Sequence, residues 1–116
     1  MALISVATDR RKAALEQWQG LGGASACALA KSGISFPAGK MAEGRVAALG
    51  ELVRALRRQA REGDVSVAQE RDIASSIRNE WVEKLQASNP AELSKDWRAY
   101  LTGGADELDE ILQLLN

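Results

Sequence analysis

Apolar residues recur at helical spacing in the middle of the chain, between Met41 and Glu62. They follow one another at intervals of three and four residues, at Val46, Leu49, Val53, Leu56 and Ala60. Such spacing keeps one side of an α-helix apolar, while arginines and glutamates take the opposite side. A single helix cannot cover its own apolar side, so we expect other helices of the chain, or a second copy, to pack against it.

Two glycines, Gly44 and Gly50, lie inside this predicted helix, close to several alanines. Each glycine costs roughly 1 kcal/mol relative to alanine inside a helix, but it has no side chain to keep a neighbouring backbone away. We therefore interpret both positions as sites of close helix packing and not as a break in the helix.

A first helix is predicted over residues 4 to 19, where apolar residues again keep helical spacing. Arg11 falls inside that apolar stripe. Its aliphatic stem would cover the edge of the core while the guanidinium reaches water or a carboxylate, and the alternative is a buried pair that fixes the register or meets a partner. Residues 33 to 40 contain Pro37 and two glycines, so we expect a loop there, where a binding loop could sit.

Another helix is predicted over residues 66 to 87. Ser66 and Gln69 have the spacing of a capping box, in which each side chain accepts a hydrogen bond from the other residue's backbone N–H. A short turn joins this helix to the one at residues 41 to 62. The two segments are therefore predicted to form an antiparallel helical hairpin at the centre of the fold.

Turn signals divide the C-terminal part of the chain. Asn89 and Pro90 mark the start of a helix, because asparagine caps helices well and proline suits the first helical position. Gly103 and Gly104 are expected to end that helix. A short last helix would then begin at Asp106.

The predicted last helix is crowded with large aliphatic side chains. They are Leu108, Ile111, Leu112, Leu114 and Leu115. Because Leu114 lies outside the face that the others share, this segment has more apolar surface than its own domain is expected to bury. We predict that these five residues contact a partner.

All of these elements are helices, so the sequence predicts an all-α fold. We expect a single helical domain over residues 1–116, a small helical bundle of four to five helices built on the hairpin of residues 41–62 and 66–87. A chain of 116 residues is long enough to bury a sizeable core. With only five aromatic residues, that core must consist mostly of aliphatic side chains.

The charges nearly cancel, since the chain has 15 basic and 16 acidic side chains. This balance disfavours a general nucleic-acid binder, which usually has a basic excess. One local cluster stands out at the end of the central helix, formed by Arg54, Arg57, Arg58 and Arg61. It is either a solvated face that complements the helix C-terminus, or a surface for an acidic partner or a nucleic-acid backbone.

Few residues are suited to catalysis or metal binding. The chain has no histidine, which is the commonest general acid–base group and metal ligand. Cys27 lacks a histidine base and is interpreted as a structural thiol. The carboxylates from Asp106 to Glu110 are expected to complement the N-terminus of the last helix. We therefore expect no enzyme activity, no cofactor and no metal site.

The chain has one cysteine and no run of 18 apolar residues. One cysteine cannot form an internal disulfide, which favours a reducing compartment. The N-terminal residues lack the order of charge and apolar run of a secretory signal. We expect a cytoplasmic protein that does not span a membrane.

These observations favour a non-enzymatic protein–protein interaction module. We expect an adaptor, regulator or inhibitory partner that acts through helix–helix contacts, and that forms a homodimer through its apolar surfaces. The alternative is a nucleic-acid-binding regulator that uses the arginine-rich helix face.

Overall fold

The computed structural model describes residues 2–22, 37–87 and 94–115. These residues form four helices: α1 (Leu3–Gly20), α3 (Pro37–Ala60), α4 (Val67–Ala87) and α5 (Lys95–Leu114). No strand occurs in the three described ranges. The predicted all-α fold is therefore confirmed. None of these helices combines the length and the apolar character that crossing a bilayer requires.

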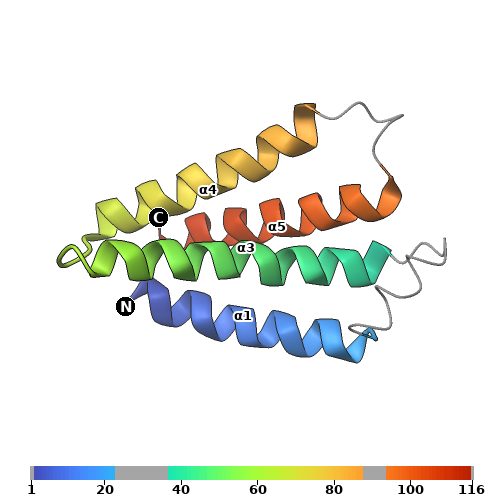
Figure 1. Cartoon of the computed structure of the whole chain (residues 1–116), viewed down its shortest axis with the longest axis horizontal. Coiled ribbons are helices and arrows are strands. Elements are labelled where there is room, and N and C mark those ends of the chain that lie inside the picture. The colour runs from blue at the N-terminus through green and yellow to red at the C-terminus, as the bar shows by residue number, and fades with distance from the viewer. Residues whose placement is uncertain (1, 23–36, 88–93, 116) are drawn as a thin grey trace.

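Helix α3 lies between α1 on one side and the pair α4 and α5 on the other (Figure 1). α1 runs antiparallel to α3, whereas α3 and α5 run in the same direction (Figure 1). The predicted hairpin is present, with α3 and α4 joined by residues 61–66. The two helices of the hairpin diverge, however, and α5 makes the most extensive contact with α3.

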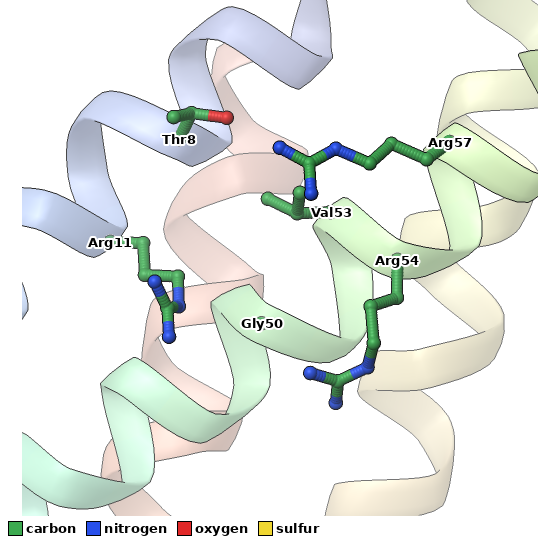
Figure 2. Close-up of a pocket in the computed structure, with 6 residues that line it drawn as sticks. All are labelled: Thr8, Arg11, Gly50, Val53, Arg54 and Arg57. Carbon is green, nitrogen blue, oxygen red and sulfur yellow. The ribbon is translucent and has the colours of Figure 1, made fainter.

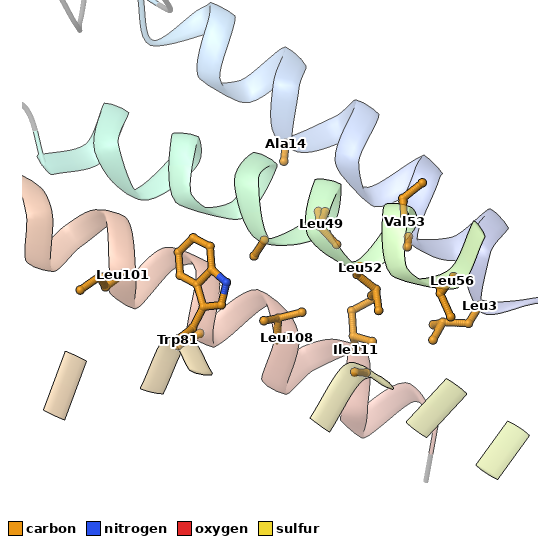
Figure 3. Packing of buried hydrophobic residues seen from close by; sticks show 14 residues of the cluster. Leu3, Ala14, Leu49, Leu52, Val53, Leu56, Trp81, Leu101, Leu108 and Ile111 are labelled. Atoms are coloured by element: carbon orange, nitrogen blue, oxygen red, sulfur yellow. The ribbon is translucent and has the colours of Figure 1, made fainter. Parts of the chain in front are cut away.

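The buried side chains form one hydrophobic cluster shared by the four helices. Figure 3 shows it between α3 and α5, with Leu3 closing one end. The fully buried large side chains are Leu3, Leu49, Leu52, Leu101, Leu108 and Ile111. α4 contributes one large buried apolar residue, Trp81, whose indole lies against α5. Aliphatic side chains therefore dominate the core, as the composition predicted.

Glycines set the distance between α3 and α5. A Cβ atom at Gly44 would clash with the backbone oxygen of Tyr100, and one at Gly103 would clash with the backbone oxygen of Met41. The prediction of close packing at Gly44 is therefore confirmed. Gly104 is equally constrained, because the indole of Trp81 occupies the place where its side chain would be.

The prediction that α5 ends at its two glycines was wrong, because α5 continues through Gly103 and Gly104 to Leu114. Glycine ends many helices, but here it makes room for other elements, and this depends on residues far away in the sequence. Asp106 accordingly lies inside α5 and begins no helix of its own.

Local capping signals explain where two helices begin. Gln69 N–H donates to Ser66 Oγ at 3.1 Å and Ser66 N–H donates to Gln69 Oε1 at 2.8 Å, which confirms the predicted capping box before α4. α5 begins after Ser94, whose Oγ accepts a hydrogen bond from Trp97 N–H. Asn89 and Pro90 lie outside the described residues.

The loop predicted over residues 33 to 40 was partly wrong. α3 begins at Pro37, so residues 37–40 are helical, and residues 33–36 lie outside the described part of the chain. Proline fits the first turn of a helix, because its missing N–H is not needed there.

Candidate arginine site

The four arginines singled out in the sequence share one exposed surface at the C-terminal end of α3. Arg54, Arg57, Arg58 and Arg61 together line a shallow hollow of about 280 Å³. A second hollow, of about 300 Å³, adjoins it at the seam between α1 and α3. Its lining consists of Thr8, Arg11, Gly50, Val53, Arg54 and Arg57 (Figure 2). We call the surface formed by Arg11, Arg54, Arg57, Arg58 and Arg61 the arginine groove.

Gly50 lies between two of these guanidinium groups, as Figure 2 shows. A Cβ atom at this position would be 3.3 Å from Arg54 Nη1 and 3.5 Å from Arg11 Nε. Both side chains therefore reach the same point above the α3 backbone, one from each helix. α3 is unbroken at Gly50, as predicted. In contrast to Gly44, however, the atoms nearest to that point belong to side chains and not to a neighbouring backbone.

No carboxylate neutralises the arginine groove within the described residues. None of its five guanidinium groups forms an ion pair there. Two other arginines do have acidic partners: Arg78 pairs with Asp109 at 2.7 Å, and Arg10 pairs with both Glu107 and Glu110. The fold thus brings unpaired positive charge together on one surface, although the whole chain has a net charge of −1.

Arg10 and Arg11 are neighbours in the sequence but face different parts of the molecule. Arg10 contacts α5, where Glu107 is buried with only 6% of its side chain exposed. The hydrogen bond to Glu107 is the main cause of a raised pKa of Arg10, which burial partly opposes. Arg11 instead lies over Gly50. The ion pair of Arg10 therefore fixes the orientation of α1 and directs Arg11 towards the arginine groove.

Comparison of the chain with models of known families, with curated proteins and with solved structures gave no match. The function must therefore be inferred from the arrangement of the side chains.

The five aliphatic residues predicted to contact a partner are in different environments. Leu108 and Ile111 are fully buried in the core, so neither presents a surface to a partner. Leu112 and Leu115 are half-buried and pack against the same core. Leu114 is the exception, with 53% of its surface exposed. The tail of the chain thus offers a much smaller apolar surface than the sequence indicated.

The acidic residues near the C-terminus have a different role from the predicted one. They lie in the second half of α5 and not at a helix N-terminus, so the expectation that they complement a helix dipole was wrong. Three of them bind arginines: Glu107 and Glu110 bind Arg10, and Asp109 binds Arg78. Among the described residues, no three potential metal ligands are grouped. Cys27 lies outside these residues.

A row of aromatic rings at the other end of the bundle was not predicted. Trp97 stacks on Tyr100 with ring centroids 5.1 Å apart, and Tyr100 contacts Trp81 at 5.3 Å. Trp97 is 49% exposed. Burial raises the pKa of Tyr100, and the negative charges of Glu43 and Glu51 raise it further. The spacing of Trp97 and Tyr100 by three residues was the available signal.

Proposed function

We propose that this protein is a non-enzymatic binding module that holds an acidic segment of a partner protein in the arginine groove. The single observation that supports this function is the convergence of five arginines without acidic partners within the described chain. Keeping these positive charges together costs electrostatic energy in the free protein. A bound acidic segment would remove that cost and form charge-assisted hydrogen bonds, which are stronger than neutral ones.

An acidic protein segment fits this surface better than a nucleic acid does. The net charge of −1 gives no long-range attraction for a long polyanion, whereas a short acidic segment needs only the local charge of the groove. In addition, Glu62 and Asp64 follow directly after Arg61 and are exposed, so a phosphate backbone running past the end of α3 would meet like charge. A guanidinium matches a carboxylate in geometry and can bind it through two parallel hydrogen bonds.

Other parts of the proposal rest on the sequence. The absence of histidine supports a binding function over an enzymatic one, and the single cysteine supports a cytoplasmic location.

The homodimer stays a prediction. Light scattering at increasing protein concentration would test the homodimer. Leu114→Asp is the suitable variant for disrupting an apolar dimer interface, because Leu114 is exposed. A monomer at every concentration would rule out the homodimer.

Fluorescence anisotropy with a labelled peptide would test the proposed function. The probe is a short peptide with a central serine between runs of glutamate. We expect the parent protein to bind it, and we expect the double variant Arg54→Gln/Arg57→Gln to bind at least about tenfold more weakly. Binding should also weaken as salt rises from about 50 to about 300 mM, because the contacts are exposed ion pairs.

A matched control removes two positive charges elsewhere. Lys95 and Arg98 are exposed at the N-terminal end of α5, which lies at the opposite end of the bundle from Arg61 (Figure 1). Lys95→Gln/Arg98→Gln should therefore bind the peptide as the parent does. Equal losses in both double variants would contradict a specific site. Tighter binding of a short DNA duplex through the same arginines would favour the nucleic-acid alternative.

A further inference from the structure

The point above Gly50 is the most unusual part of the arginine groove. The guanidinium groups of Arg11 and Arg54 approach it from two different helices, and Arg57 lines the same hollow (Figure 2). Val53 is buried beneath them and supplies no polar group. The Thr8 hydroxyl donates its hydrogen to the Ile4 carbonyl at 2.7 Å, so it is not a donor to a ligand. The available donors in this hollow are therefore guanidinium groups.

The charge at this point exceeds what one carboxylate would neutralise. A glutamate or aspartate of a partner carries one negative charge, whereas a phosphorylated serine or threonine carries nearly two and offers three strong acceptor oxygens. Two guanidinium groups, each with a planar set of N–H donors, can bind separate oxygens of one phosphoryl group. We propose that the Arg11–Gly50–Arg54 hollow binds the phosphoryl group of a phosphorylated serine or threonine in the partner. This inference rests on the proposed function.

Gly50 supports this proposal because helix packing does not explain it. A Cβ atom at Gly44 or Gly103 would clash with backbone atoms of another helix, but the three atoms nearest to a Cβ at Gly50 belong to guanidinium groups. Glycine weakens the interior of a helix. At this position it lets the guanidinium groups of Arg11 and Arg54 lie close together over the α3 backbone, where one phosphoryl group can accept hydrogen bonds from both. Arg58 and Arg61 extend the surface along α3 and would contact acidic residues that flank the phosphorylated side chain.

The test uses three forms of the peptide described above, with serine, phosphoserine or glutamate at the central position. We expect the phosphoserine peptide to bind at least about tenfold more tightly than the glutamate peptide. Arg11→Gln should bring the two peptides to within about twofold of each other, because one of the two converging donors is lost. Arg11→Lys keeps the charge but cannot bind in a bidentate manner, so it should retain only part of the preference.

The outcomes separate this inference from the proposed function. Equal affinity of the parent for the phosphoserine and glutamate peptides would overturn the phosphoryl site and leave the acidic-partner function in place. No binding of any of the three peptides would overturn both. A preference that persists in Arg11→Gln would place the phosphoryl group elsewhere and overturn the site. Inorganic phosphate is also tested as a competitor of the phosphoserine peptide. If it displaces the peptide at concentrations as low as those at which the peptide itself binds, the ligand is a small phosphate, and the proposal of a phosphorylated protein partner is overturned.

Discussion

The ion pair between Arg10 and Glu107 should contribute substantially to the stability of the bundle. Arg10 Nε donates to Glu107 Oε1, and Arg10 Nη2 donates to Glu110 Oε2. These bonds join α1 to α5 across 97 and 100 residues of sequence. Glu107→Gln keeps the size of the side chain but removes its charge. This substitution should therefore test the ion pair without creating a cavity.

The burial of the two partners sets the size of the effect. Removing one member of a fully buried ion pair costs about 3–5 kcal/mol, whereas an exposed pair contributes about 0.2–1 kcal/mol. The Glu107 side chain is 6% exposed and that of Arg10 is 32% exposed. Arg10 also retains Glu110 as a partner. We therefore expect Glu107→Gln to lower the free energy of unfolding by about 2 kcal/mol, between these limits.

Urea unfolding followed by tryptophan fluorescence and circular dichroism would measure this change. Asp109→Asn is the matched control, because Asp109 lies on α5 like Glu107 but pairs with Arg78 of α4, and both of these side chains are more than one third exposed. Its effect should stay below about 1 kcal/mol. Equal effects of the two substitutions, or a change below about 1 kcal/mol in Glu107→Gln, would refute the reasoning from burial.

Two further predictions concern stability. Gly44→Ala should lower the free energy of unfolding by at least about 2 kcal/mol, because its Cβ would clash with the Tyr100 backbone. Gly50→Ala should instead raise the free energy of unfolding by about 0.5–1 kcal/mol, because glycine weakens the interior of a helix. Urea unfolding measures both, and effects of the same sign would contradict the different roles of these glycines. The raised pKa of Tyr100 means that the unfolded chain loses the phenol proton first, so stability should fall as pH rises above about 10. Tyr100→Phe should reduce that fall, and identical pH profiles of parent and variant would exclude this contribution.

Much of the fold could be predicted because the signals are local. The helical spacing in α3 and the capping box at Ser66 involve residues within a few turns of one another. The end of α5 was mispredicted for the opposite reason. Gly103 and Gly104 have the usual sequence signature of a helix end, but their neighbours are Met41 and Trp81, which lie elsewhere in the chain. Nothing in the local sequence indicates those neighbours.

The candidate site could be predicted only in part. Four of its arginines follow one another closely in the sequence at the C-terminal end of α3, so their clustering was visible in the sequence. Arg11 was recognised as a residue in an apolar stripe, but its position over Gly50 depends on how α1 packs against α3. The pairing of Arg10 with Glu107 likewise depends on the packing of α1 against α5. Which arginines lack an acidic partner among the described residues thus depends on the tertiary structure.

Amide NMR of the isotope-labelled protein during titration with the acidic peptide tests the central claim most directly, because it locates the bound segment. The account predicts that the largest shift changes occur along the seam of α1 and α3, at Thr8, Arg11, Gly50, Arg54 and Arg57. The aromatic end, with Trp97 and Tyr100, should change little. Largest changes at Trp97 and Tyr100, or no changes at peptide concentrations that saturate the anisotropy signal, would contradict the assignment of function to the arginine groove.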